Sequence, residues 1–349
     1  WLTRVPGGLA ISNIGACSIF AALSGSSPAT CAAIGKMGIP EMRKHGYPEE
    51  LATGSIAAGG TLGILIPPSV TMIIYGISTG TSIGRLFIAG VLPGLMLTLL
   101  FIGWSMYYSL RSGTFAKSSR RHFSLREKFE QIPRVLPFLL IIAGILYALY
   151  GGVATPSEAA GVGAMLCFIL IAVIYGIRKP KQIWDILSTS TRESVMIMMI
   201  IGAAELLSYT LSSLFITQSV AEWIATIGVN RWLLLAIINV FLLVAGFFLP
   251  PVAVILMTAP ILLPIILQAG FDPYWFAVVL TINMEIGLIT PPVGLNLYVI
   301  NGIVPDVGLP QILRGTVPFV LLMLLSIILL CVFPEIATWL PERLMGVSG

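Results

Sequence analysis

The sequence carries very little charge. Only 10% of its 349 residues are Asp, Glu, Lys or Arg, and 57% are hydrophobic, whereas a soluble domain carries about 25% charged residues. A soluble globular domain is therefore excluded. The apolar runs are too long and too continuous for the alternating pattern of an outer-membrane barrel. The composition thus predicts an all-α polytopic membrane protein.

Histidine and cysteine are also scarce. His45 and His122 lie in polar loops, so a Ser-His hydrolase dyad has no support, and no Gly-x-x-x-x-Gly-Lys-Ser/Thr loop is present for ATP hydrolysis. The four cysteines lie in apolar stretches without metal-ligand spacing, and we expect them to be reduced packing residues. The net charge of +4 comes from short loops and does not indicate nucleic-acid binding. We therefore expect a protein that is not an enzyme.

What the sequence does contain is an internal repeat. Residues 24–94 reappear loosely about 224 positions later, with Gly63–Pro68 (GILIPP) matching Gly287–Pro292 (GLITPP). Pro40 matches Pro264, and Gly46 matches Gly270, at the same offset. Two hydrophobic segments broken by Gly and Pro at corresponding positions are the best sequence indication of a secondary transporter's binding site.

Spans and hairpins can be placed from the apolar runs, because a membrane-spanning helix needs about 20 such residues. Uninterrupted candidates are 86–110, 135–151, 159–177, 194–216 and 316–333, and two interrupted ones, 51–79 and 274–303, are broken around 63–68 and 287–292. Regions 9–39 and 232–263 are predicted to be re-entrant hairpins with tips at 24–28 and 249–251. Irregular backbone within a membrane is tolerated only inside protein or beside water. The two tips and two breaks therefore predict one internal polar site.

The topology follows from the basic residues. Loop 111–134 is long and basic, and a cytoplasmic loop that obeys the positive-inside rule explains it better than a nucleic-acid or lipid-binding role. Threading the chain from this loop places 16 of the 19 Lys and Arg residues inside, all except Arg85, Arg231 and Arg343. The same threading places the two hairpins on opposite sides of the membrane, so the repeats are predicted to be inverted.

Four regions result from this organisation. They are a first hairpin and broken helix (1–94), connecting and scaffold helices (95–230), a second hairpin and broken helix (231–303), and a final scaffold helix with a tail (304–349). The second copy follows spans that run from about 135 to 230, and the first copy does not. If both halves are built alike, we expect roughly 80–90 further residues before Trp1.

The tips and breaks supply the candidate ligands. Proline removes an amide donor and leaves an upstream carbonyl free, and glycine lets the backbone unwind. Freed carbonyls and serine hydroxyls suit Na⁺, and half-helix N-termini suit an anionic substrate. The alternative is that these residues only kink and pack helices. Candidate substrate contacts are Ser26, Ser69, Thr71, Glu205, Asn283, Glu285 and Asn296.

Three glutamates fall in or near apolar spans, where an ionisable residue is a functional candidate. Glu158 follows Thr155-Pro156-Ser157 and is expected to cap a helix. Glu205 and Glu285 are each interpreted either as a proton or cation partner or as support for the unwound backbone.

Four motifs together resemble a known family. They are Ser24–Ala29 (SGSSPA), Gly59–Ser69 (GGTLGILIPPS), Leu86–Gly94 (LFIAGVLPG) and Asn283–Gly294 (NMEIGLITPPVG). In this combination, over residues of about 9 to 334, the chain resembles the large membrane subunit of tripartite ATP-independent periplasmic (TRAP) transporters.

The resemblance implies a fold, ions and partners. The fold would be an inverted-repeat, elevator-type transporter, with two or more Na⁺ where each hairpin tip meets the broken helix of its own half. By position, the first Na⁺ site would use Ser24, Ser27, Gly63 and Pro67, and the second Gly287, Thr290 and Pro291. The substrate would be an organic acid such as a C4-dicarboxylate or sialic acid. A periplasmic binding protein would deliver it to the lipid-embedded subunit in a bacterial inner membrane, and a small four-helix membrane subunit, separate or fused, would brace the scaffold.

Rival functions remain open at this point. A stand-alone sodium/dicarboxylate symporter of similar architecture would need no binding protein. An ion channel would not need a co-ion gradient, and an intramembrane enzyme would need a nucleophile with a nearby base.

Overall fold

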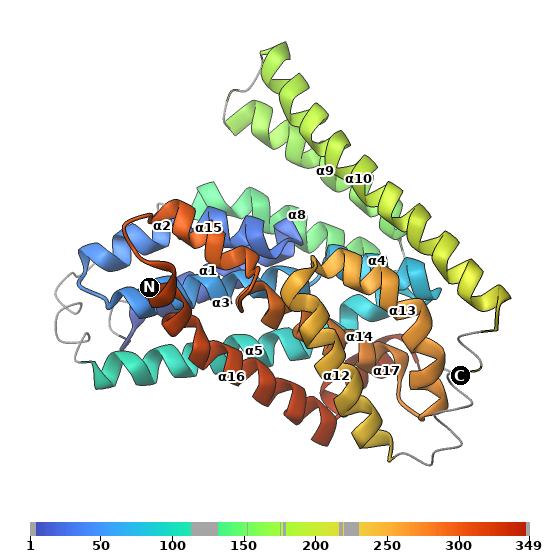
Figure 1. The fold of residues 1–349 in the computed structure, drawn as a ribbon. Coiled ribbons are helices and arrows are strands. Elements are labelled where there is room, and N and C mark those ends of the chain that lie inside the picture. Colours follow the sequence, from blue (N-terminus) through green and yellow to red (C-terminus); the bar gives the residue numbers. More distant parts are fainter. Residues whose placement is uncertain are drawn as a thin grey trace. The chain divides into compact units, whose positions relative to one another are not determined.

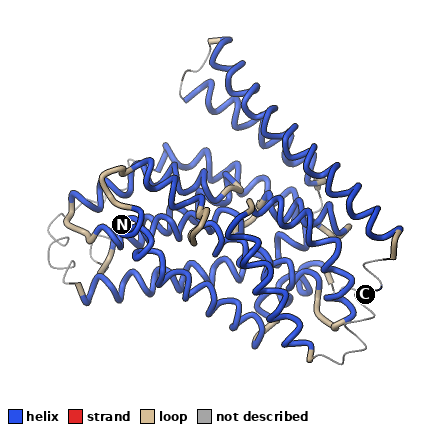
Figure 2. Tube along the Cα trace, in the orientation of Figure 1, coloured by secondary structure: helices blue, strands red, loops and turns tan. Residues whose placement is uncertain are grey.

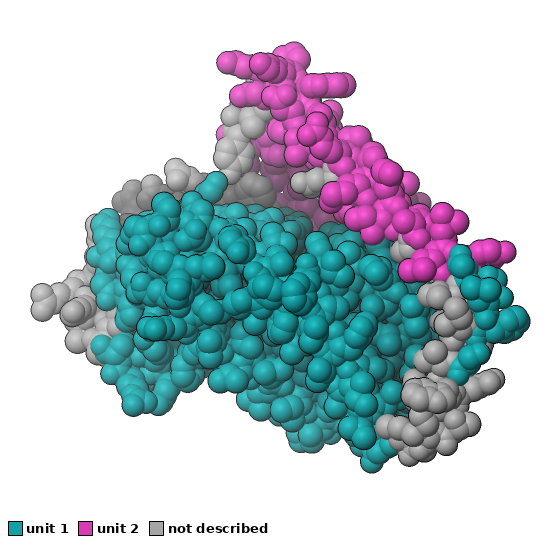
Figure 3. Space-filling view, viewed as in Figure 1, with its two compact units in different colours: residues 1–122, 210–349 teal, residues 123–209 magenta. Residues whose placement is uncertain are grey.

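The computed structural model describes residues 5–112, 132–151, 153–174, 176, 179–215, 219 and 230–346, and the described residues contain helices but no strand. They form two compact units, one of residues 1–122 and 210–349 and the other of residues 123–209 (Figure 3). Short loops join most of the helices (Figure 2). The two units are described separately below.

In the part of the first unit that the structure describes, two sets of five helices occur in the same order, and one more helix follows them. The first set is α1 (Gly8–Ser24), α2 (Ser27–Lys44), α3 (Glu49–Leu65), α4 (Val70–Thr79) and α5 (Ile83–Arg111). The second set is α12 (Arg231–Phe248), α13 (Pro251–Gln268), α14 (Pro273–Leu288), α15 (Leu295–Ile303) and α16 (Leu309–Val332), and α17 (Glu335–Met345) follows. Each set comprises two helices joined by a short tip, two helices separated by a break, the second of them short, and one long helix.

The core of this unit is formed by α3 and α14. Every residue of α3 from Leu51 to Leu65 is buried, as is every residue of α14 from Trp275 to Leu288. Helices that are apolar on all sides belong in such a core. Glycine allows α3 to approach its neighbours closely, because a Cβ atom at Gly54 would lie 2.1 Å from the carbonyl oxygen of Gly315 in α16.

The two sets of helices pack against each other reciprocally. The returning arm of the first hairpin, α2, packs on α15, and the returning arm of the second, α13, packs on α4 (Figure 1). In the same way α3 contacts α16, and α14 contacts α5. Each half therefore supports the broken helix of the other half.

The hairpin tips are shorter than the sequence predicts. Only Gly25 and Ser26 lie between α1 and α2, and only Leu249 and Pro250 lie between α12 and α13. Proline at the first or second position of a helix has no hydrogen bond to lose, so the helices that follow each tip begin earlier than expected. Gly25 has a positive φ of 57°, which glycine adopts without strain.

The helix breaks lie further along the chain than the predicted 63–68 and 287–292. Residues 66–69 separate α3 from α4, and residues 289–294 separate α14 from α15. Proline disfavours helical backbone in the residue before it, so each helix continues through its Gly63 or Gly287 motif glycine and stops just before its proline pair. The predicted placement was therefore wrong by two or three residues.

The second unit contains α8 (Ile132–Tyr150), α9 (Pro156–Ile174) and α10 (Pro180–Ser213). Helix α10 begins 14 residues before the predicted 194, because hydropathy detects only its apolar part. Glu158 forms the expected cap, since its carboxylate accepts hydrogen bonds from the Thr155 amide at 2.8 Å and from the Thr155 hydroxyl at 2.9 Å.

Six helical segments among the described residues are long and apolar enough to cross a membrane, with 49–79 counted as one. The described fold is thus that of a multi-pass membrane protein. The short helix α17 was not predicted, because its charged residues interrupt the apolar pattern that identifies spans.

Candidate functional site

The first hairpin tip gathers three oxygen atoms. The Ser24 hydroxyl lies 2.8 Å from the Thr30 hydroxyl, and the Thr30 hydroxyl donates to the Ser26 carbonyl at 2.8 Å. A Cβ atom on Gly63 would lie 2.6 Å from that same Ser26 carbonyl and 2.8 Å from the Thr30 hydroxyl. The tip therefore sits directly on the last turn of α3, at the position of the motif glycine.

The first break is held by hydroxyl groups. Pro68 has no amide to donate to the Ile64 carbonyl, which a regular helix would require. The Ser69 hydroxyl donates to this carbonyl at 2.5 Å, and the Thr71 hydroxyl at 3.2 Å. Ser69 also caps α4 by accepting from the Met72 amide at 3.4 Å. Ser69 and Thr71 thus replace the hydrogen bond to the Ile64 carbonyl that Pro68 removes.

The second hairpin meets its own break through backbone atoms. A Cβ atom on Gly287 would lie 2.3 Å from the carbonyl oxygen of Gly246, near the end of α12. The Val293 amide in the break donates to the Phe247 carbonyl at 3.2 Å. The Thr290 hydroxyl turns back and donates to the Ile286 carbonyl at 2.5 Å. Each tip region therefore contacts the break of its own half.

The two breaks differ in exposure. In the first, Pro67 and Ser69 are buried, whereas in the second Pro291, Pro292 and Val293 are exposed. The freed carbonyls of the first break are consequently enclosed by protein, and those of the second lie nearer to the surface of the described residues.

Asn296 joins the two halves. It lies at the second position of α15, and its side-chain amide donates to the hydroxyl of Ser27 at 3.0 Å and to the Ala57 carbonyl at 3.1 Å. Ser27 is the first residue of α2. The N-terminal ends of two helices from different halves therefore meet at this contact, and each end carries a partial positive charge.

Asn283 and Glu285 lie deeper in α14. The Asn283 amide donates to the Asn239 side-chain carbonyl at 2.6 Å, which links α14 to α12. Glu285 is fully buried, and neither of its carboxyl oxygens has a hydrogen-bond partner among the described residues. Thr61 of α3 is the polar group on that side, although its hydroxyl donates to the Ala58 carbonyl at 2.6 Å.

Several of the predicted residues in the first unit meet at three places, whereas Pro67, Ser69 and Thr71 lie at the first break and Asn283 and Glu285 lie deeper in α14. Ser24, Ser26 and Gly63 meet at the first tip, Gly287, Thr290 and Pro291 lie in or beside the second break, and Ser27 meets Asn296 between the halves. The side chain of Glu205 lies outside the described residues. Thr30 and Asn239 were not predicted. A polar residue inside an apolar span was the available signal for Asn239, but nothing in the sequence shows that Thr30 faces the tip.

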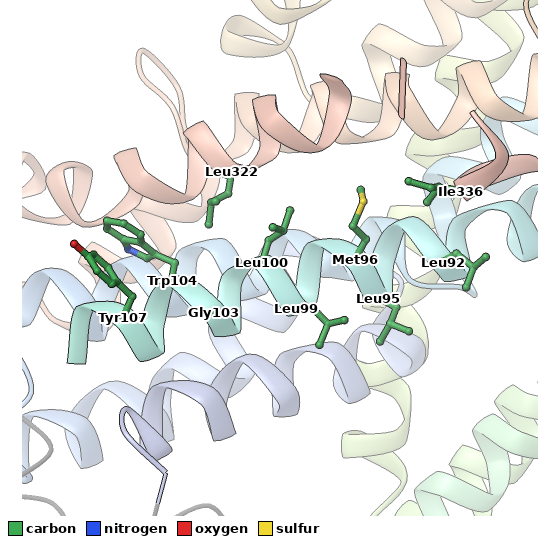
Figure 4. Close-up of a pocket in the computed structure, with 10 residues that line it drawn as sticks. All are labelled: Leu92, Leu95, Met96, Leu99, Leu100, Gly103, Trp104, Tyr107, Leu322 and Ile336. Carbon is green, nitrogen blue, oxygen red and sulfur yellow. The ribbon is translucent and has the colours of Figure 1, made fainter. Parts of the chain in front are cut away.

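A cavity of about 810 Å³ lies elsewhere in the first unit, between α5, α16 and α17 (Figure 4). Its lining consists of aliphatic and aromatic residues and one glycine. It offers no cationic or amide side chain to an organic acid, so the polar tips and breaks remain the better candidate site.

Comparison with known proteins places the chain in a family. A family model described as the DctM component of tripartite ATP-independent periplasmic transporters matches residues 2–336. The chain belongs to this family.

Several DctM-family relatives are similar over nearly the whole chain. A C4-dicarboxylate TRAP transporter large permease from Pseudomonas aeruginosa is 40% identical over 345 residues, which cover 99% of this chain and 80% of the relative. A C4-dicarboxylate permease from Vibrio cholerae is 37% identical, with 97% of this chain and 79% of the relative covered. The sialic acid permease of Vibrio cholerae is 32% identical, with 98% and 79% covered.

Proposed function

We propose that this chain is the transport subunit of a Na⁺-coupled importer of organic anions in a bacterial inner membrane, with C4-dicarboxylates as the substrate class. The relatives named for C4-dicarboxylates are 36–40% identical, and the one named for sialic acid is 32% identical. Relatives named for isethionate and ectoine, each 33% identical, show that the family name alone does not fix the substrate.

The observation that carries the proposal is the hydrogen bond between Ser27 and Asn296 at 3.0 Å. It brings the positive ends of α2 and α15 together, and such an arrangement attracts a carboxylate. The carboxyl-terminal ends of α1 and α3 meet nearby, where Ser26 contacts Gly63, and carbonyl-rich ends suit a cation. An anion site and a cation site would therefore be neighbours, and each charge would stabilise the other.

In this proposal Ser24, Gly63 and Pro67 belong to the first Na⁺ site, with Ser26 in place of the Ser27 expected from the sequence, because Ser27 pairs with Asn296. Gly287, Thr290 and Pro291 belong to the second. Ser69 and Thr71 hold the first break open from within and support the Na⁺ site without contacting substrate. The reciprocal packing of the halves supports an inverted repeat. An elevator movement of the hairpins and broken helices would then expose the site on either side of the membrane.

The partners are part of the proposal as well. A periplasmic binding protein would deliver the substrate, and a small four-helix membrane subunit would brace the permease, as the family implies. The test is uptake of radiolabelled succinate into proteoliposomes that contain the full-length permease and its small membrane subunit. An inward Na⁺ gradient and the binding protein are each supplied or omitted.

Uptake that requires both Na⁺ and the binding protein is the expected result. Uptake with Na⁺ alone would identify a stand-alone symporter instead. Uptake that does not depend on Na⁺ would contradict the proposed Na⁺ sites. Transport of sialic acid without transport of succinate would contradict the proposed substrate class.

A further inference from the structure

The apolar cavity of Figure 4 is a groove along one face of α5. Leu92, Met96, Leu100, Gly103 and Tyr107 follow one another every three or four residues and therefore share a helix face. In Figure 4, Met96 and Leu100 point toward Leu322 across the groove, whereas Leu95 and Leu99 point away. Beside the groove α5 and α16 are joined by an edge-to-face contact between Phe101 and Phe319, with ring centroids 5.2 Å apart.

The dimensions of the groove suit a slender apolar chain. The residues from Leu92 to Tyr107 extend along α5 for about 22 Å at 1.5 Å per residue, which exceeds one leaflet of about 15 Å of hydrocarbon. The cavity measures about 810 Å³. Gly103 keeps the middle of the groove open, since a Cβ atom there would meet nothing within 4 Å.

One end of the groove carries a cation and a cluster of aromatic rings. The Arg111 guanidinium donates to the Tyr107 hydroxyl at 3.3 Å, and the Trp104 ring lies 5.5 Å from that of Tyr107 and 6.4 Å from that of Tyr108. Arg111 is exposed and takes part in none of the ion pairs found among the described residues. Tryptophan, tyrosine and arginine in this arrangement are typical of the membrane–water interface.

We propose that this groove binds one acyl chain of a glycerophospholipid, with the lipid phosphate beside Arg111 and Tyr107. The apolar lining matches the hydrocarbon chain, and the Arg111 guanidinium, which has no ion-pair partner among the described residues, matches the negative phosphate. The bound lipid would fix α5 against α16, and these helices contact α3 on either side.

The test is native mass spectrometry of the full-length chain, purified in mild detergent from its own membrane, with retained phospholipids counted. Gly103→Leu adds a side chain in the groove, and its Cβ atom would meet nothing within 4 Å. The matched control is Gly161→Leu, because Gly161 is exposed on α9 and its Cβ would also meet nothing within 4 Å. Each methylene that loses its contact should weaken binding about fourfold, so we expect retention by Gly103→Leu to fall at least about tenfold.

Arg111→Gln leaves the groove intact and tests the phosphate contact. We expect its lipid retention to fall about fivefold, the effect of one basic residue near an anionic surface, and Arg111→Lys should restore most of it. A second measurement needs no detergent. In vesicles of phosphatidylglycerol with brominated acyl chains, quenching of tryptophan fluorescence should be weaker for Trp104→Phe and for Gly103→Leu than for the unmodified chain.

Equal lipid retention and equal quenching in Gly103→Leu, Gly161→Leu and the unmodified chain would overturn the proposal. A polypeptide or a second copy of the chain that is released by Gly103→Leu, with lipid unchanged, would also overturn it, because the occupant would then be protein.

Discussion

At the scale of single residues, two glycines determine how the hairpins sit on the broken helices. Gly63 and Gly287 lie 224 residues apart, and at each position the space for a Cβ atom is taken by a backbone carbonyl, that of Ser26 at 2.6 Å or that of Gly246 at 2.3 Å. Any side chain there must displace backbone. The glycines of the two repeat motifs are therefore required by the close approach of two backbones.

Gly63→Ala should displace the first hairpin tip from α3. Overpacking of this kind costs about 1–3 kcal/mol, so we expect the Na⁺ concentration for half-maximal uptake to rise by about tenfold. Gly15→Ala is the matched control, because its Cβ would meet nothing within 4 Å in the neighbouring α1. Uptake into proteoliposomes at varied Na⁺ measures both variants. If Gly63→Ala left the Na⁺ concentration for half-maximal uptake unchanged, the first hairpin tip would not be part of the Na⁺ site.

At the scale of elements, the breaks are stable structures and not frayed helices. Pro68 in the first break has no amide to donate to the Ile64 carbonyl. The hydroxyl groups of Ser69 and Thr71 donate hydrogen bonds to this carbonyl instead. Because this carbonyl is enclosed among buried residues, leaving it without a donor would cost about 1–3 kcal/mol.

Ser69→Ala should therefore lower the melting temperature of the full-length chain in detergent, and Ser69→Ala/Thr71→Val should lower it further. The single change also removes the α4 cap, which is worth about 0.5–2 kcal/mol. Ser12→Ala is the control, since Ser12 is exposed and donates only within α1, to the Gly8 carbonyl at 2.6 Å. Equal melting temperatures for Ser69→Ala and Ser12→Ala would contradict the proposed support of the break.

The elements were predictable from the sequence to different degrees. The glycines and prolines predicted the existence of both tips and both breaks, because these residues act on the local backbone. Their bounds shifted by a few residues, since a helix continues up to the residue before its proline. Helix α17 and the start of α10 were missed because they are amphipathic or polar. The contact of Ser27 with Asn296 could not be predicted, since it depends on the packing of α2 against α15.

At the scale of the whole first unit, the residues that join the two halves lie at three levels. Ser27 meets Asn296 near the tips, and Thr61 faces Glu285 where α3 and α14 lie together in the core. Thr61 and Glu285 are also separated by 224 residues, so the repeat offset pairs two residues that face each other. An approximate two-fold axis would pass between two such residues, which supports the proposal that the halves are related by symmetry.

The third level is an exposed ion-pair cluster. The Arg43 guanidinium at the end of α2 binds both carboxylate oxygens of Asp306, in the loop before α16, and also binds Glu49 at 2.8 Å. Arg43 holds the pKa of Asp306 below its usual range. An acid with a lowered pKa stabilises the folded state above its unfolded value of about 3.9, and this contribution is lost as the pH falls through the folded value.

Asp306→Asn should consequently lower the melting temperature only slightly at pH 7, and the difference from the unmodified chain should shrink at 1 M salt and below about pH 3.9. The reason is that the Asp306 side chain is 59% exposed, so water and salt screen its attraction to Arg43. Asp185→Asn, on an exposed position of α10, is the matched control and should show neither dependence. If Asp306→Asn lowered the melting temperature at pH 7 as much as Ser69→Ala does, this ion-pair cluster would instead hold the two halves together. Buried hydroxyls and backbone contacts would then no longer account for most of their association.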